Sequence, residues 1–434
     1  MQTSAIQTSP TTPVDLRTPP LIRRNMILFA LSQSFNGAGM QLAYGIGPLM
    51  VLALTHSATL AGLSVALIGL SRFLVSYPVG RLMDAYGRKP AILLGQMLAL
   101  LGALLLGLSI HVESVALFVG GLLTFGMGMN AAQQLRVAAT DMYPPQRRGQ
   151  ALGYVALGSF AGLLFMPPIM HFSELYASSI GQNPLGLPWI LMPLLILPGM
   201  LLISLVRPDP RDIGMNLAQY YPGYVPAPHA RDGASSPFDW RVAVRPLPIR
   251  LAIACNVAAQ GNMAVIMVLT SLVLHDHGHS LSAIAFSHMF HSAGMFAFTI
   301  PLGRLSDRIG RERVMYPGLL IAIVGAALVA FPYSYIAVTL GTFLVGLGWA
   351  AANVAATAYI ADHSKTSERG RTIGVNDTCA GAIAVVMAVL SGPLIAGFGL
   401  SAAGLTAMVV SLLPLALLPA VLAARRQRAL GAPS

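Results

Sequence analysis

Long apolar stretches alternate with short polar ones along the chain. Each stretch has about the 20 apolar residues that a helix needs to cross a bilayer. Twelve can be drawn, with ends defined to within several residues: 26–54, 59–79, 91–110, 114–139, 150–172, 188–206, 249–274, 281–302, 314–331, 335–360, 371–397 and 401–423. The pattern predicts an all-α polytopic membrane protein with twelve transmembrane helices.

Composition supports this prediction and narrows the class. Of 434 residues, 55% are hydrophobic and 9% charged, whereas a soluble domain carries about 25% charged residues. The net charge of +11 does not indicate a nucleic-acid-binding protein, because the charges lie in the loops. Cys255 and Cys379 both lie inside apolar segments, which excludes the disulfide framework of a secreted domain.

The basic residues mark one side of the membrane. Lys and Arg fall before the first segment, after every even-numbered one and in the central loop, while the other loops contain none. By the positive-inside rule, both termini and the central loop are predicted to be cytoplasmic. The predicted organisation is a cytoplasmic tail (1–22), a six-helix bundle (23–206), a cytoplasmic loop (207–248), a second bundle (249–424) and a short cytoplasmic tail (425–434).

The two halves repeat each other in sequence. GRLMDAYGRKP at 80–90 recurs as GRLSDRIGRER at 303–313. Asp141, seven residues before Arg148, corresponds to Asp362, seven before Arg369. Two repeated halves of several helices each are typical of transporters.

These residues resemble the loop motif of the major facilitator superfamily. The motif is matched at Gly80, Leu82, Asp84, Gly87, Arg88 and Lys89, and again at Gly303, Leu305, Asp307, Gly310 and Arg311. The resemblance implies two pseudo-symmetric bundles around a central cavity, with the motif as a gate on the cytoplasmic side. Arg136 and Asp141 are predicted to join this gate network with Asp84, proton coupling being the alternative.

The chain departs from the proton-coupled drug exporters of that superfamily. They carry an Arg in the fourth helix four residues before a Gly-x-Gly, and Leu122 stands at that position here. Their fifth helix has Gly-Pro where this chain has Gly162 followed by Leu163. Gly158 and Gly162 are therefore expected to serve helix packing.

Two pairs of residues suggest a soft-metal site. Met263 and Met267 are spaced i, i+4 in the seventh segment, as are His291 and Met295 in the eighth, so each pair shares one helix face. Met263 and His291 are each about ten residues, or roughly 15 Å, from the outer end of their helix. Thioethers and imidazole suit Cu(I). The alternatives are ordinary core methionines and a hydrogen-bonded packing histidine.

The four residues also resemble the motif of the CcoA-type bacterial copper importers. That resemblance implies a multi-pass protein of the bacterial inner membrane that imports copper for cbb3-type cytochrome oxidase assembly. Copper would be the substrate, with no prosthetic group. The expected partners are the lipid bilayer and a cytoplasmic copper acceptor protein, with no nucleic acid, and the protein is expected to act as a monomer. Cys255 and Cys379 would parallel the membrane cysteines of that family, or be buried small apolar residues.

The sequence alone does not decide the roles of several other polar residues. His288 either faces the same cavity as His291 or bonds to a neighbouring helix. His275, His277 and His279 form a loop that either collects copper or is a solvated polar turn, and Arg72 has no assigned role. We do not predict an enzyme, because no nucleotide-binding or catalytic motif is present. The alternative functions are an organic-solute or drug exporter and a copper-sensing or assembly protein that does not transport.

Overall fold

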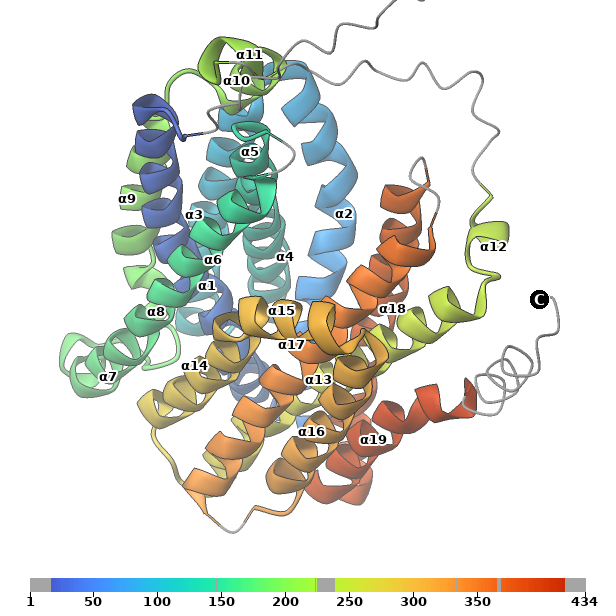
Figure 1. Cartoon of the computed structure of the whole chain (residues 1–434). Coiled ribbons are helices and arrows are strands. Elements are labelled where there is room, and N and C mark those ends of the chain that lie inside the picture. The colour runs from blue at the N-terminus through green and yellow to red at the C-terminus, as the bar shows by residue number, and fades with distance from the viewer. Residues whose placement is uncertain are drawn as a thin grey trace, which may run out of the picture.

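The computed structural model describes residues 17–144, 147–222, 224, 239–332, 334–364 and 368–417, and these residues form helices joined by short turns. The predicted tails lie almost wholly outside the described residues, as does much of the predicted cytoplasmic loop. Two groups of helices, coloured blue to green and yellow to red, are visible in Figure 1. The all-α polytopic prediction is confirmed.

The first half consists of helices from Pro20 to Ser204, followed by two short helices of the central segment. In order they are α1 (Pro20–Thr55), η1 (Ala58–Leu60), α2 (Leu63–Tyr86), α3 (Arg88–His111), α4 (Val115–Ala132), α5 (Leu135–Asp141), α6 (Arg148–Gly162), η3 (Leu163–Phe165), α7 (Met166–Tyr176), η4 (Ser178–Ile180), α8 (Leu187–Leu191), α9 (Pro193–Ser204), α10 (Pro210–Met215) and α11 (Leu217–Tyr220).

The second half follows with its own series of helices. They are α12 (Trp240–Ala243), α13 (Leu247–Asp276), α14 (Leu281–Ala297), α15 (Thr299–Ile309), α16 (Glu312–Ala330), α17 (Tyr335–His363), α18 (Arg369–Phe398), α19 (Leu400–Leu412) and η5 (Leu413–Leu417).

The predicted segments correspond to these helices. By length and composition, ten described helices could cross a membrane, and there is an eleventh if α14 and α15, which meet at a bend of 41°, count as one span. The twelfth predicted segment, 401–423, begins as the shorter apolar helix α19, and its end lies beyond the described residues.

Small residues let the helices approach closely. A Cβ built on Gly158 would lie 2.1 Å from the carbonyl oxygen of Ala30, and one on Gly162 would lie 2.1 Å from that of Ser34. Both carbonyls belong to α1, so α6 packs directly on the α1 backbone. The expectation that this glycine pair serves packing is confirmed.

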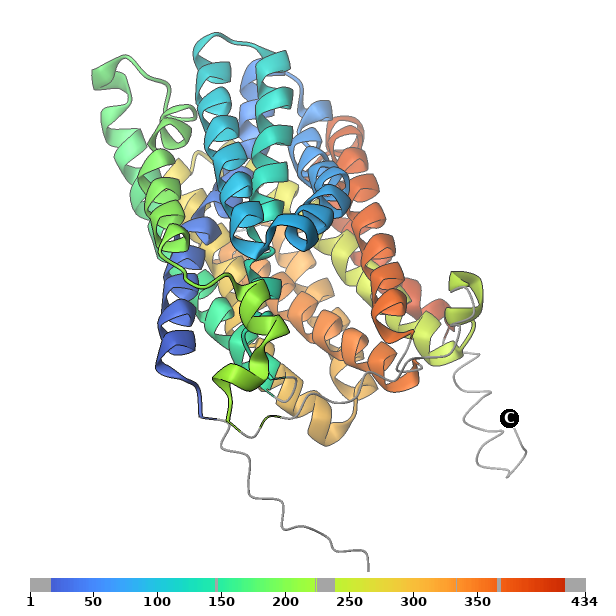
Figure 2. The ribbon, with the colours of Figure 1, turned by 90° about the horizontal axis from the view of Figure 1, so that it is seen from above.

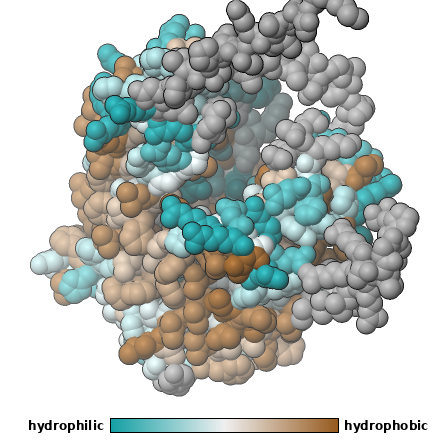
Figure 3. All heavy atoms as spheres, viewed as in Figure 1, coloured by the Kyte–Doolittle hydropathy of each residue, from teal (hydrophilic) through white to brown (hydrophobic). Residues whose placement is uncertain are grey.

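The halves meet at one end and diverge at the other. Gly62, before α2, lies against the carbonyl oxygen of Ala388 on α18, and Gly392 lies against that of Thr59. At the opposite end, which carries α10, α11 and α12 and is called here the central-loop end, α2 and α18 separate (Figure 1). Figure 2 views the two groups of helices along the perpendicular direction, and Figure 3 shows a recess between them with hydrophilic residues inside it. The described structure is therefore open towards its central-loop end.

Candidate functional site

His291 is fixed by α17. Its Nδ1 lies 2.9 Å from the carbonyl oxygen of Thr342, and its side chain is buried. A carbonyl can only accept a hydrogen bond, so Nδ1 must carry the proton and donate it. Nε2 then holds a lone pair, and no described residue bonds to it.

His288 is fixed by α13 and α1 in the opposite tautomer. The hydroxyl of Ser271 donates to the carbonyl oxygen of Gly45 at 2.8 Å, and the same Oγ lies 3.0 Å from His288 Nε2. Because the hydroxyl proton is committed to Gly45, Nε2 must be the donor in the second bond. The lone pair of His288 is therefore on Nδ1, which is also buried without a bonding partner among the described residues.

The two imidazoles thus share one chemical property. Each is held by its protonated nitrogen and keeps the other nitrogen as a buried lone pair, and the two rings are close enough to interact electrostatically. Metal-binding histidines are held in this way, by a hydrogen bond from the nitrogen that does not bind the metal. His288, undecided from the sequence, is a candidate equal to His291.

The contact between Ser271 and His288 sets the depth of the methionines. The helices α13 and α14 run in opposite directions, and Ser271 lies opposite His288. His291, three residues further along α14, is therefore level with residue 268 of α13, next to Met267. Met263, one helical turn before Met267, lies roughly 6 Å further towards the central-loop end, near the level of Met295. The prediction that Met263 and His291 lie at the same depth is therefore corrected: His291 lies nearer the depth of Met267.

The methionines nearer the central-loop end are also the more exposed ones. Met267 is buried, whereas Met263 and Met295 are partly exposed. Among the described residues, no three His, Cys, Asp or Glu side chains are grouped to hold a metal ion. A metal site at this position would therefore need donors other than these four residue types beside the two imidazoles, and the thioether of Met267 is a candidate.

The first half contributes Gln41 to this region. Its side-chain amide on α1 donates to the carbonyl oxygen of His288 at 3.0 Å and also contacts the hydroxyl of Ser292. The histidine pair is therefore attached to both halves, through Gln41 and Gly45 of α1 and through Ser271 and Thr342 of the second half. A relative motion of the halves would change its surroundings.

The other sequence candidates lie apart from this cluster. Cys255 is buried in an apolar cluster formed by α13, α16 and α17, and Cys379 is exposed on α18. In the predicted histidine loop, His277 Nδ1 bonds to the carbonyl oxygen of Val273 at 2.7 Å, and the ring of His279 packs 5.1 Å from that of Tyr335.

The gate motif forms equivalent networks in the two halves. Arg88 bonds to Asp84 at 3.0 Å and to Asp141 at 2.7 Å. In the second half, Arg311 bonds to Asp307 and, at 2.9 Å, to Asp362. These hydrogen bonds, chiefly the one that Arg311 donates to Asp362, raise the pKa of Arg311 above its usual value.

Gly87 and Gly310 adopt φ values of 102° and 100° between the helices of each gate network, a conformation that suits glycine. Gly80 and Gly303, in contrast, lie inside helices.

The predicted place of Arg136 in the gate network stays a prediction. Arg136 makes no ion pair with a described carboxylate, and its electrostatic neighbour is Arg72. Arg136 and Asp141 are five residues apart on α5, which separates them by about 140° around the helix. Asp141 therefore reaches Arg88 while Arg136 points elsewhere.

Asp209 is a gate residue that the motif does not contain. Its carboxylate accepts hydrogen bonds from the backbone N–H groups of Arg88 at 3.0 Å and Lys89 at 2.9 Å. It thereby caps the N-terminus of α3, where a negative charge is favourable. Its position before a proline in the stretch RPDPRD, after the sixth predicted helix, indicates a helix cap, but the sequence does not reveal which residues it contacts.

At the end opposite the central loop, Glu174 joins the two halves. Its carboxylate, on α7, accepts hydrogen bonds from the backbone N–H groups of Leu281 and, at 3.2 Å, Ser282, at the start of α14. Sequence reasoning assigned Glu174 no role, although an acid just beyond an apolar segment was visible.

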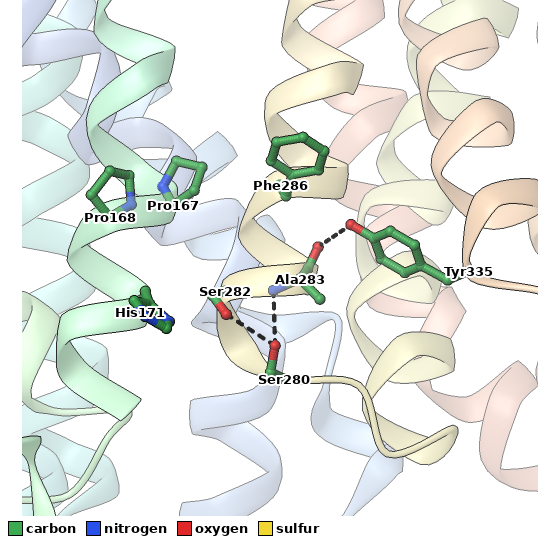
Figure 4. A pocket seen from close by; sticks show the side chains of 8 residues that line it. All are labelled: Pro167, Pro168, His171, Ser280, Ser282, Ala283, Phe286 and Tyr335. Atoms are coloured by element: carbon green, nitrogen blue, oxygen red, sulfur yellow. Dashed lines mark hydrogen bonds between the residues drawn. The ribbon is translucent and has the colours of Figure 1, made fainter. Parts of the chain in front are cut away.

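The contact of Glu174 with the start of α14 is called here the clasp. An open surface pocket of about 450 Å³ lies beside it. Figure 4 shows it between Pro167, Pro168 and His171 of α7 on one side and Phe286 of α14 and Tyr335 of α17 on the other. The Tyr335 hydroxyl donates to the carbonyl oxygen of Ala283 at 2.9 Å.

Comparison with known proteins agrees with the repeated gate. The family model of the Major Facilitator Superfamily matches residues 29–249 and 251–433. The chain belongs to the major facilitator superfamily. It is therefore a multi-pass membrane transporter, and the superfamily's loop motif accounts for the two Arg-centred networks.

Individual relatives are more distant. An uncharacterized MFS-type transporter of Bacillus subtilis, YdeG, is 28% identical over 98% of this chain and 97% of its own length. The riboflavin transporter RfnT of Brucella anthropi is 25% identical over 82% of this chain and 85% of its own length.

Solved structures share the fold. The nucleoside transporter NupG has a TM-score of 0.67 at 12% identity, covering 93% of this chain and 98% of that one. The xylose transporter XylE from E. coli, in an inward-open conformation, has a TM-score of 0.67 at 14% identity, covering 91% and 95%. At such identities the likeness concerns the fold alone.

Proposed function

We propose that this transporter imports copper across the bacterial cytoplasmic membrane by alternating access, supplying copper for cbb3-type cytochrome oxidase assembly. The observation that carries the proposal is the pair of buried imidazoles, His288 and His291, each with a protonated nitrogen engaged and a lone pair left on the other. Together with Met267 at a similar depth, they would form a neutral donor set of nitrogen and sulfur, which suits Cu(I).

The arrangement also suits release. Thioether and neutral imidazole bind a metal without losing a proton, so no charge has to be neutralised when the ion leaves. Met263 and Met295 lie nearer the central-loop end and are partly exposed. They form the next donors on the path towards the recess, and we assign the central-loop end to the cytoplasm because the basic loops lie there.

In this cycle, copper enters when the clasp at Glu174 is open and the central-loop end is closed. It binds to the imidazole and thioether donors, and the halves then rock into the arrangement described here. A cytoplasmic acceptor protein receives the ion at the central-loop end. The gate networks of Arg88 and Arg311 would hold the central-loop end closed in the other state.

The decisive test is copper uptake by proteoliposomes containing the purified protein, under reducing conditions that keep copper as Cu(I). Uptake should be strongly reduced in Met267→Leu and in His291→Gln. Met97→Leu is the matched control, since Met97 is exposed on α3. Wild-type uptake in both cavity variants would refute the proposal.

A second candidate function is transport of an organic solute, favoured by the similarity to a riboflavin transporter over most of the chain. Riboflavin flux in the same proteoliposomes, unchanged by Met267→Leu and without any copper flux, would favour it. Copper binding without flux of either compound would instead indicate a copper-sensing or assembly protein.

A further inference from the structure

The pocket beside the clasp has no part in the proposed copper path. Its volume of about 450 Å³ falls in the usual range of ligand sites, about 300–1,000 Å³. Figure 4 shows α7 of the first half on one side of it and α14 and α17 of the second half on the other. A molecule that fills the pocket therefore touches both halves at once.

The pocket lies near the ends of membrane-spanning helices, opposite the central loop. Every residue that lines it except Ser280 belongs to a helix that could cross a membrane, alone or as part of the bent pair α14 and α15. The span that contains α7 ends at Tyr176, about five residues or roughly 7 Å beyond His171. The exposed rings of Phe172 and Tyr176 pack 4.7 Å apart there, and aromatic rings are typical of the level of the lipid headgroups. The pocket therefore lies where the hydrocarbon of a bilayer meets its headgroups.

One part of the pocket is apolar and continues along α14. Pro167 and Pro168 of α7 lie on the opposite side of the pocket from Phe286 of α14. The ring of Phe290, one turn further along α14 towards the middle of the membrane, lies 5.0 Å from that of Phe286, and both rings are exposed. Exposed rings in line suit a hydrocarbon chain, which buries apolar surface against them.

The other part of the pocket carries hydrogen-bond donors. The hydroxyls of Ser280 and Ser282 lie 2.9 Å apart, and the Ser280 oxygen also accepts the N–H of Ala283 at 3.2 Å. Only one of the two hydroxyl protons is used between these oxygens, so the second is left for a ligand. His171 makes no hydrogen bond with another described residue, and its ring always carries at least one N–H. These donors suit the oxygens of a phosphate group.

The clasp places a negative charge at the edge of this polar part. The Glu174 carboxylate bonds to the backbone of Ser282, whose side chain lines the pocket. An ionised carboxylate has about four acceptor positions, and the N–H groups of Leu281 and Ser282 fill two of them. Glu174 therefore disfavours a headgroup with net negative charge and suits one that also carries a cation.

We propose that the pocket binds a phospholipid whose headgroup carries both a phosphate and a primary ammonium group, as phosphatidylethanolamine does. The phosphate accepts hydrogen bonds from His171 and a serine hydroxyl, and the ammonium group donates to Glu174. One acyl chain lies along Phe286 and Phe290.

The lipid acts on the conformational equilibrium because both halves form its site. It binds the described state better than a state in which α7 and α14 have separated, and a ligand favours the state that it binds better. The lipid thereby stabilises the state that is open at the central-loop end. The site does not depend on copper.

Binding can be measured by calorimetry on the purified full-length protein in detergent, with dihexanoyl phosphatidylethanolamine as the probe. The wild type should bind it saturably. His171→Ala and Phe286→Ala should each weaken binding roughly tenfold, because one removes a hydrogen bond to a charged group and the other removes apolar contact. Both side chains are exposed, so their removal should leave the fold intact.

His111→Ala and Phe398→Ala are the matched controls. Both residues are exposed at helix ends on the same side of the molecule as the clasp, and neither lines the pocket. These variants should bind the lipid as the wild type does.

The headgroup is tested with two lipids of the same chain length. Phosphatidylcholine carries three methyl groups on its nitrogen and donates no hydrogen bond, and phosphatidylglycerol has no cation. Both should bind roughly tenfold more weakly than phosphatidylethanolamine. In Glu174→Gln the preference for ethanolamine over choline should shrink to near unity. A shift of the variant between its two states changes both affinities alike, so this ratio isolates the contact with the ammonium group.

The effect on the equilibrium is measured in nanodiscs with spin labels on α7 and α14. Replacing phosphatidylcholine by phosphatidylethanolamine should raise the share of the short distances that belong to the described state. His171→Ala should lose this response.

The inference is overturned if the wild type does not bind phosphatidylethanolamine, or if His171→Ala and Phe286→Ala bind it as tightly as the wild type. Equal affinity for phosphatidylcholine would overturn the assigned headgroup, and free phosphoethanolamine that binds as tightly as the lipid would overturn the assignment to a lipid. An unchanged distance distribution would overturn the stabilisation of the described state. None of these outcomes bears on copper uptake, so the two proposals fail separately.

Discussion

The carboxylate of Glu174 accepts a hydrogen bond from the backbone N–H of Ser282 at 3.2 Å, and so ties α7 of the first half to the start of α14 in the second. The neighbouring N–H of Leu281 bonds to the same carboxylate. A carboxylate at a helix N-terminus gains both from hydrogen bonds and from the helix dipole. This clasp favours the state in which the central-loop end is open.

Glu174→Gln should shift the transporter towards the opposite state. Hydrogen bonds to charged groups contribute about 1.5–3 kcal/mol each, and the glutamine keeps only one uncharged acceptor oxygen. A shift of roughly tenfold in the ratio of the two states is expected. Distances between spin labels on α7 and α14 would measure it.

Glu113→Gln is the control for that experiment, because Glu113 is also exposed at this end of the molecule and lies in the turn between α3 and α4. It should leave the distance distribution unchanged. An unchanged distribution in Glu174→Gln itself would show that the clasp does not bias the equilibrium.

The gate networks predict unequal effects for the two partners of Arg88. The Asp84 side chain is 78% exposed, whereas Asp141 is 22% exposed. Asp84→Asn should therefore cost about 0.2–1 kcal/mol, as exposed ion pairs do, and Asp141→Asn should cost more. Thermal unfolding of both variants in detergent gives the comparison, and equal losses would contradict it.

Much of this architecture follows from the sequence, for physical reasons that differ between elements. Apolar length and the placement of basic residues predicted the helices, because the bilayer imposes both. The repeated motif predicted that Asp141 and Asp362 occupy equivalent places, and the structure joins them to Arg88 and Arg311.

The rest depended on information that the residue order does not contain. The partner of His291 is the backbone carbonyl of Thr342, and every residue type has such a carbonyl. The level of His291 against Met267 depends on the register between α13 and α14, which the contact of Ser271 with His288 sets. Arg136 and Asp141 are close in sequence, but their separation of five residues on α5 places their side chains about 140° apart around the helix.

The register between α13 and α14 places Met267 and Met263 in different surroundings. Met267 is buried at the level of His291, while Met263 is partly exposed about one turn away. Met267→Leu should weaken Cu(I) binding more than Met263→Leu, by roughly tenfold if it removes a direct ligand. Competition with a Cu(I) chelator would measure both affinities. A larger loss for Met263→Leu would place the site nearer the central-loop end.

The close packing of α6 on α1 predicts a sharp contrast between two glycines. In Gly158→Ala, the added Cβ would lie 2.1 Å from the carbonyl oxygen of Ala30, so the helices must separate. Overpacking of this kind costs about 1–3 kcal/mol. Gly120 on α4 has nothing within 4 Å of an added Cβ, so Gly120→Ala should be neutral or stabilise by up to about 1 kcal/mol. Thermal unfolding of the two variants tests the packing directly, since both add the same methyl group to a helix. If Gly158→Ala were as stable as Gly120→Ala, then α6 could not lie against the α1 backbone as described.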